Sequence, residues 1–246
     1  FVHINILEYK IGSMSKNNCK VEWWSVVPGL TKVEPVQSAT KFIPSWFKNM
    51  PKFLEPDNFM DKGTLKNCPG FVDYFKNAYV ITMWCDFHLK VDKKDFAWHS
   101  SNQDFTMSLH YDNQFKDYIP SNAKDKYLCV AKTDCPWRVR TSPGWAMMQL
   151  PMFYDFNENF ECMPGITHTE WSHQINQQLL IKKEGEFLIE KGTPLAMYVP
   201  IRLTELETTV QDEDKEKYEA SFVSNMIFQS KFRGAYKKFK DKWSKE

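Results

Sequence analysis

Two histidines and a glutamate near position 170 have the types and spacing of metal ligands. His168 and Glu170 project from the same face of an extended chain, because strand side chains repeat every two residues. With one more histidine they would form a facial triad of two imidazoles and one carboxylate, which leaves positions on Fe(II) open for dioxygen or substrate. The third ligand would be His173, His110 or His99. The cluster therefore predicts a divalent metal such as iron, although a His-x-Glu pair also arises by chance.

A second pair, Asp86 and His88, lies on the polar side of a stretch in which apolar and polar residues alternate. A carboxylate two residues from an imidazole on one face can orient the ring for acid–base chemistry. The same pattern is typical of the solvated side of a half-buried strand. Both interpretations stay open.

Aromatic and arginine side chains form a further set of predicted binding residues. Indole rings stack on sugar rings or bases, so an exposed row of tryptophans would favour a glycan-binding protein. Large domains also use tryptophan in their cores. Arg138 and Arg140 share one side of a predicted strand and could clamp an anion, or form ordinary cross-strand charge pairs. The predicted binding residues are Trp137, Arg138, Arg140, Trp145 and Trp171, together with Asp86 and His88.

Composition and missing motifs exclude several classes of protein. The chain contains no GxxxxGK[ST], GxGxxG, GxSxG or HExxH motif, which removes the commonest nucleotide-binding, hydrolase and zinc-protease interpretations. With 32 Lys and Arg against 31 Asp and Glu, the net charge of +1 argues against a dedicated nucleic-acid binder. Apolar runs such as 78–85 fall far short of the roughly 18–20 residues that span a bilayer. We therefore expect no nucleic-acid partner and no transmembrane segment.

The elements that would position these residues are mostly strands. Alternation over 79–91 predicts one long half-buried strand. Ser142-Pro143-Gly144 suits a type II turn, because glycine accepts its positive φ, and predicts a hairpin between the runs that flank it. Many short strands with few helices favour a mainly β fold, a jelly-roll-like β-sandwich or small barrel. The other predicted strands are 21–27, 96–100, 105–110, 127–132, 137–141, 145–150, 175–182, 186–189 and 194–201.

Helices are expected at the two ends of the chain. We predict one domain over 1–246, in which an irregular and helical segment at 1–77 covers a β core at 78–202. Asn67-Cys68-Pro69 predicts a helix start within that cover. From 210 to 246 the aromatic residues recur at helical spacing, which predicts a long C-terminal helix. That helix packs on the β core, serves as the contact of a homo-oligomer or of another partner, or lies as a basic amphipathic helix on a membrane surface. The six cysteines form no CxxC pair, so we expect reduced thiols.

Several segments resemble an uncharacterised protein family of marine tailed phages and bacteria. The segments 42–47 and 65–71 look like proteins of those phages, and Trp137 to Trp145 resembles a TPPGW-like hairpin in a domain of unknown function. Residues 165–171 match a G-[IV]-x-x-T-[DE]-W element, and 191–200 match a closing kGxP…P strand pair. The resemblance covers roughly residues 40–202 and implies no assigned activity.

Two functions remain as expectations. The first is a phage-encoded soluble binding or assembly domain without catalysis, located in the host cytoplasm or in the virion. The alternative is a cupin-like, metal-dependent oxygenase of the non-haem iron type, in which His168 and Glu170 are ligands and another histidine completes the site. A concave site where polar groups converge would favour the enzyme, whereas an exposed tryptophan row would favour binding.

Overall fold

The computed structural model describes residues 18–54, 63–92, 95–208 and 210. The chain divides into two compact units, Phe1–Met50 with Cys68–Thr204, and Pro51–Asn67 with Glu205–Glu246. The first unit contains every strand found among the described residues. The predicted helix at 210–246 lies outside the described residues except for its first position. The organisation as one domain stays a prediction.

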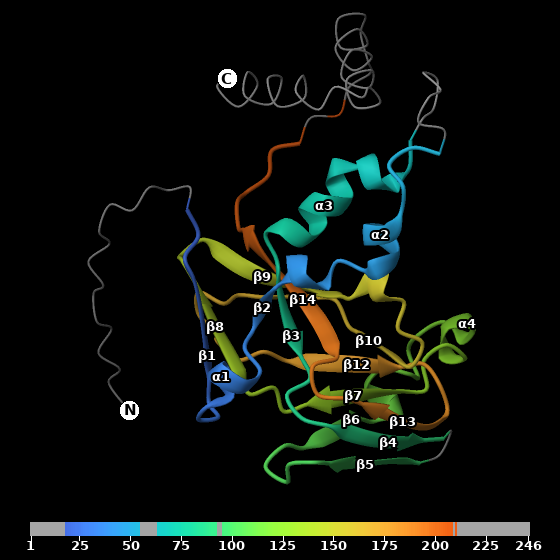
Figure 1. Ribbon diagram of the computed structural model, residues 1–246. Helices are drawn as coiled ribbons and strands as arrows, with labels where there is room; N and C mark the ends of the chain where they lie inside the picture. Colours follow the sequence, from blue (N-terminus) through green and yellow to red (C-terminus); the bar gives the residue numbers. More distant parts are fainter. Residues whose placement is uncertain (1–17, 55–62, 93–94, 209, 211–246) are drawn as a thin grey trace, which may run out of the picture. The chain divides into compact units, whose positions relative to one another are not determined.

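Short strands dominate the first unit and form four antiparallel sheets (Figure 1). The strands are β1 Val21–Ser25, β2 Gln37–Ser38, β3 Tyr79–Thr82, β4 Phe87–Val91, β5 Phe96–Ser100, β6 Met107–His110, β7 Cys129–Thr133, β8 Trp137–Thr141, β9 Trp145–Pro151, β10 Phe160–Cys162, β11 Gly165–Thr167, β12 Gln177–Ile181, β13 Gly185–Ile189 and β14 Pro194–Arg202. They pair in the orders β1-β8, β10-β12-β7-β6, β11-β9-β14-β3-β2 and β13-β4-β5. The mainly β class is confirmed, none of these sheets closes into a barrel, and the jelly-roll arrangement stays a prediction.

The helices of the described residues are short. The α-helices are α1 Leu30–Val33, α2 Ser45–Asn49, α3 Pro69–Lys76 and α4 Ser121–Lys124, and the 3-10 helices are η1 Ala39–Phe42, η2 Leu65–Asn67, η3 Asp112–Gln114 and η4 Phe153–Asp155. The predicted helix start at Pro69 is confirmed by α3. No described helix is long and apolar enough to cross a membrane.

Strand β14 lies at the centre of the five-stranded sheet, and both faces of that sheet are buried. Side chains along β3 and β14 alternate between two apolar clusters. Ile81 and Ala196 belong to the larger cluster, whereas Val80 and Met197 belong to the smaller one. All four side chains are fully buried. Because both faces are covered, these strands show a nearly continuous apolar sequence, and the two clusters share this sheet as a common layer.

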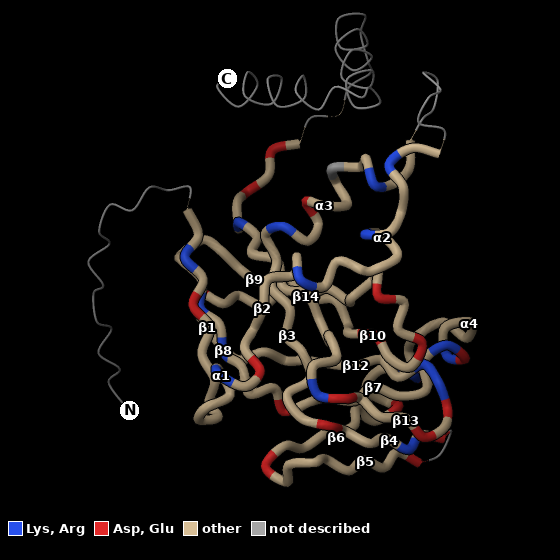
Figure 2. Tube along the Cα trace, viewed as in Figure 1, with Lys and Arg blue, Asp and Glu red and all other residues tan. Residues whose placement is uncertain are grey.

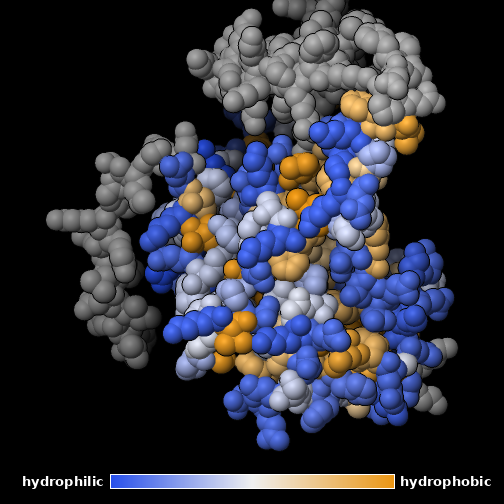
Figure 3. Space-filling model, in the orientation of Figure 1, coloured by the Kyte–Doolittle hydropathy of each residue, from blue (hydrophilic) through white to orange (hydrophobic). Residues whose placement is uncertain are grey.

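Helices α2 and α3 cover the face of this sheet that carries the smaller cluster (Figure 1). Phe47 of α2 stacks on Phe71 of α3, with ring centroids 3.8 Å apart and an interplanar angle of 11°. Phe75, one turn later, is also buried in this cluster. On the face of the molecule seen in Figure 3, hydrophilic side chains surround small apolar patches, as expected when most large apolar side chains are inside.

Replacing Phe75 with alanine is expected to destabilise the protein more than the matched change Val72→Ala on the same helix. Phe75 is 2% exposed and Val72 is 38% exposed. We expect Phe75→Ala to lower the free energy of unfolding by about 3–5 kcal/mol, because it removes buried area and leaves a cavity. Val72→Ala should lower it by less than about 1 kcal/mol. Urea unfolding would measure both, and equal effects would contradict the described packing.

The structure corrects the single long strand predicted at 79–91, which is two strands in two different sheets. Residues 83–86 separate β3 from β4. The N–H of Met83 donates to the carbonyl of Thr193, and its own carbonyl accepts from the N–H of Gly192, both at 2.8 Å. Met83, Trp84 and Cys85 are all buried. The alternation of apolar and polar residues therefore does not indicate a continuous strand here, because the chain passes through the core from one sheet to another.

The predicted hairpin at 137–150 is also corrected. The tight turn is present, since the N–H of Trp145 donates to the carbonyl of Ser142 at 3.2 Å and Gly144 has a φ of 77°. However, β8 pairs with β1, whereas β9 pairs with β11 and β14. The turn is therefore a corner between two sheets. Turn residues predict the reversal of the chain but not the partner of each strand.

Candidate functional site

The structure gives Glu170 a different role from that of a metal ligand. Its carboxylate Oε2 accepts a hydrogen bond from the backbone N–H of Gly144 at 2.7 Å. Thr169, next to it, is fully buried, and its hydroxyl lies 2.7 Å from that of Thr141. Glu170 therefore holds the corner between β8 and β9 in place.

Of the predicted histidine ligands, His168 and His173 lie in the segment between β11 and β12, whereas His110 lies on β6. His173 Nδ1 donates to the carbonyl of Thr169 at 3.1 Å, and His110 on β6 accepts at Nε2 from the side-chain amide of Gln178 at 3.2 Å. His168 is exposed. Across the described residues, no three His, Cys, Asp or Glu side chains form a group that could hold a metal ion. The predicted iron triad is not assembled there.

Replacing Glu170 with alanine is expected to reduce stability, because it removes a charge-assisted hydrogen bond from the corner turn. We expect the free energy of unfolding to fall by about 1–3 kcal/mol. The matched control is Glu184→Ala, an exposed glutamate, which should change it by less than about 0.5 kcal/mol. Urea unfolding measures both variants. A Glu170→Ala protein as stable as the control would contradict this role.

Asp86 and His88 do not form an acid–base pair. Asp86 lies in the break before β4, where its carboxylate accepts from the backbone N–H of Lys191 at 2.7 Å. His88 lies opposite His99 on the neighbouring strand β5, and both rings are exposed. The carboxylate therefore fixes a loop, and the two histidines occupy the solvated face of the β4–β5 pair.

The predicted row of exposed tryptophans is not formed. Trp137 is 2% exposed and belongs to the larger apolar cluster. Trp145 is half-buried, whereas Trp171 is 80% exposed. Arg138, Arg140 and His173 share a face with Trp24 of β1.

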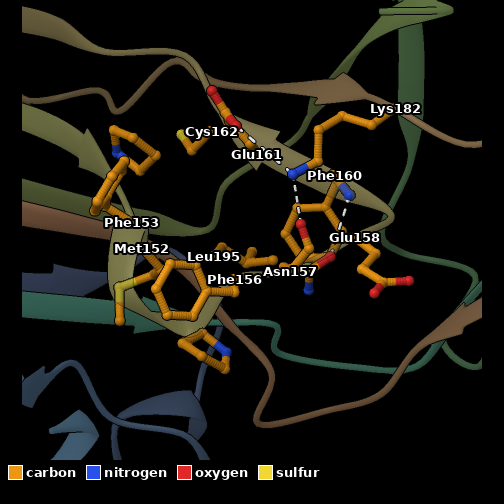
Figure 4. A pocket seen from close by; sticks show the side chains of 12 residues that line it. Met152, Phe153, Phe156, Asn157, Glu158, Phe160, Glu161, Cys162, Lys182 and Leu195 are labelled. Atoms are coloured by element: carbon orange, nitrogen blue, oxygen red, sulfur yellow. Dashed lines mark hydrogen bonds and ion pairs between the residues drawn. The ribbon is translucent and has the colours of Figure 1, made fainter. Parts of the chain in front are cut away.

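A cavity that the sequence did not predict lies beside the segment between β9 and β10 (Figure 4). Its volume is about 320 Å³, and its walls come from residues 151–162, from the end of β12 and from the start of β14. Most of the wall is apolar, with Met152, Phe153, Phe156 and Leu195 among its side chains. Ligand sites in proteins are typically concave and mainly apolar with a few polar groups.

The polar end of the cavity is built around Lys182. Its ammonium group donates to the carbonyl of Asn157 and lies 3.6 Å from a carboxylate oxygen of Glu161 (Figure 4). The side chain of Asn157 accepts from the N–H groups of Asn159 at 2.9 Å and Phe160 at 3.1 Å. These contacts connect the segment between β9 and β10 to the end of β12. They also pair the ammonium group of Lys182 with the carboxylate of Glu161.

Phe153 and Phe156 form the unusual part of the wall. Both rings are 63% exposed, and their centroids are 6.3 Å apart. Phe156 has φ 53° and ψ 37°, and it is the one non-glycine residue with positive φ among the described residues. Left-handed backbone costs an L-residue about 1–2 kcal/mol. An observed outlier of this kind, beside a cavity, marks a candidate functional site.

No protein-family model and no curated protein matches this sequence. Function must therefore be inferred from the chemistry of the site. The sequence did contain one signal for the cavity, since residues 153–160 combine three phenylalanines and a tyrosine in a segment between two strands. Large apolar side chains in a connecting loop indicate either a covered loop or a binding surface.

The thiol at the cavity wall is a weak nucleophile. Burial raises the pKa of Cys162, and of Cys135 nearby in the core, to about 12. Burial also raises the pKa of Cys129 to about 11. A thiol attacks as its thiolate, so these groups are protonated and unreactive at neutral pH. All six cysteines are free, as the sequence predicts.

Thiol labelling of the native protein at pH 8 is expected to modify Cys68, which is exposed, before the buried thiols. Cys85, Cys135 and Cys162 are buried, and burial raises the pKa of each. They should react with Ellman's reagent only after unfolding in guanidinium chloride. Rapid labelling of Cys162 in the native state, located by peptide mass spectrometry, would contradict the described burial.

Proposed function

We propose that this chain is a binding domain without catalysis, and that it holds a small apolar or aromatic group in the cavity between Phe153, Phe156 and Lys182. The observation that carries this proposal is the pair of exposed phenyl rings on a strained loop at the mouth of an apolar cavity. The group belongs either to a free small molecule or to a side chain of a partner protein, since both present the same apolar chemistry.

The size of the cavity supports a ligand of about two fused or linked rings. Cavities of about 150 Å³ accommodate benzene, and natural ligand sites begin at about 300 Å³. The present cavity, at about 320 Å³, lies at the lower end of that range. It therefore suits a compact aromatic group better than a long chain.

The charges around the cavity support recognition rather than reaction. Lys182 is paired with Glu161, and Glu158 lies 3.5 Å from the ammonium group of Lys183 outside the cavity. The thiol of Cys162 is protonated. Paired charges of opposite sign form a polar rim, while the apolar wall supplies affinity through buried area.

Binding of N-phenyl-1-naphthylamine, a neutral two-ring dye that fluoresces in apolar sites, tests the proposal. We expect saturable binding to the wild type and a loss of affinity of about tenfold or more in Phe153→Ala, because a phenyl contact is removed. The control is Tyr118→Ala, which removes an 81% exposed ring that is not part of the cavity lining and should leave affinity unchanged. Absence of saturable binding to the folded wild type would overturn the proposal.

Two substitutions at Phe156 separate the role of the ring from that of the backbone. Phe156→Ala and Phe156→Gly both remove the ring, so both should weaken dye binding. Glycine accepts φ 53° without strain, so Phe156→Gly should unfold with up to about 1 kcal/mol more free energy than Phe156→Ala. Urea unfolding and dye titration measure the two effects. An alanine variant more stable than the glycine variant would contradict the strained conformation.

The resemblance to an uncharacterised family of marine tailed phages and bacteria stays a prediction. In that setting the cavity would seat a ligand or a partner segment, either in the infected host cell or in the assembled virion. The dye assay is independent of this setting, because it tests the cavity alone.

A further inference from the structure

A second face of the molecule gathers residues that the sequence had singled out separately. We call it the arginine face, and it consists of Trp24, Arg138, Arg140, Trp171 and His173. In the β1–β8 pair, Arg138 lies opposite Trp24 in register. The guanidinium carbon of Arg140 lies 5.7 Å from the centroid of the Trp24 ring. The ring of His173 meets the same indole at 5.5 Å, edge to face. The Trp24 ring therefore contacts both the guanidinium group of Arg140 and the imidazole ring of His173.

The segment 169–173 runs along the other edge of β8. The N–H of Val139 donates to the carbonyl of His173 at 3.0 Å, and the N–H of Thr141 donates to that of Thr169 at 3.4 Å. Between these two bonds β8 has one residue, Arg140, whereas the segment has three. The extra residues must bulge, and Trp171, at the middle of the bulge, is 80% exposed. The backbone of Trp171 therefore lies level with Arg140 along β8, and its indole is exposed to solvent.

Among the described carboxylates, none forms an ion pair with Arg138 or Arg140. Glu22 lies opposite Arg140 in register, but its carboxylate pairs with Lys20 at 3.2 Å. The carboxylate of Glu170 accepts from Gly144. Arg138 donates from Nη1 to two backbone carbonyls, at 2.8 and 2.9 Å, which orients the group without cancelling its charge. Figure 2 shows both basic and acidic positions around the β1–β8 pair.

His173 adds an acceptor to the face. A ring nitrogen that faces a carbonyl oxygen must carry a proton, so Nδ1 donates to Thr169, and in the neutral form of the ring Nε2 carries a lone pair. A ligand that bears hydroxyl groups could donate to this atom. The face thus combines donors for an anion, an acceptor for a hydroxyl and an exposed flat ring.

We propose that the arginine face binds an acidic oligosaccharide, in which a sugar carboxylate pairs with Arg140 and a sugar ring packs on Trp171. Guanidinium groups bind carboxylates through two parallel hydrogen bonds, and indole rings pack against the apolar faces of sugars. The hydroxyls of the same sugars match Nε2 of His173. This inference is independent of the cavity proposed above, because the two sets of residues do not overlap.

The charge of the whole chain favours an acidic sugar over nucleic acid. A polyphosphate requires a broad basic surface, and proteins that bind it usually carry a strong basic excess. This chain has a net charge of +1, and four of its 32 basic residues are arginine. Two local guanidinium groups suit one or two carboxylates rather than a row of phosphates.

Isothermal titration calorimetry with tetragalacturonic acid tests the proposal, with neutral maltotetraose as the matched ligand. We expect binding of the acidic sugar alone, weakened at least about tenfold in Arg140→Gln, because a charged hydrogen-bonded pair is lost. Trp171→Ala should weaken it similarly. Lys90→Gln makes the same charge change on β4 and should bind as the wild type does. Thermal unfolding of each variant confirms that it is folded.

Four outcomes would overturn the proposal. The first is that the folded wild type does not bind tetragalacturonic acid, and the second is that it binds maltotetraose equally well. The third is that Arg140→Gln and Trp171→Ala bind the acidic sugar with unchanged affinity. The fourth is that the wild type binds single-stranded oligodeoxythymidine through Arg140 in preference to the acidic sugar, which would assign the face to nucleic acid. Dye binding at the cavity, measured on the same samples, would remain unchanged in each case.

Discussion

Burial of β14 on both faces and along both edges is the constraint on which the rest of the structure depends. Its backbone pairs with β9 on one side and with β3 on the other. Its side chains enter both apolar clusters, so the helical cover and the remaining sheets pack against a common layer. The cavity uses the start of this strand as a wall, and the corner turn joins β9 to the arginine face. The cavity therefore borders this strand directly, whereas the arginine face is linked to it through β9.

The sequence predicts secondary structure and burial best where a strand has one buried face and one solvent-exposed face. Phe87, Leu89 and Val91 are buried, whereas His88 and Lys90 between them are exposed, and the alternation of β4 shows this directly. In β3 the same alternation misleads, because Val80 and Thr82 are as buried as Ile81. Alternation cannot indicate that helices cover the second face, and it cannot indicate where the chain passes from one sheet to another.

The sites depend on pairings that local patterns do not contain. Arg140 and His173 meet around Trp24 because residues 169–173 add to the edge of β8, although the hydrogen-bonded partners are 28 and 34 positions apart in sequence. The spacing of His168 and Glu170 predicts a shared face only if the chain there is extended, whereas it turns at 169–171. The left-handed backbone at Phe156 has no sequence signal, because glycine or asparagine is the usual residue there.

The position of β14 near the end of the described chain has a consequence for synthesis on the ribosome. Strands β3 and β9 emerge long before their common partner, and each leaves a row of backbone donors and acceptors unpaired. At about 5–20 residues per second, the nascent chain exposes these edges for seconds. Until β14 has been synthesised, the unpaired edges of β3 and β9 are prone to form backbone hydrogen bonds with other chains. The yield of folded protein should therefore depend on translation rate and on chaperones that shield strand edges.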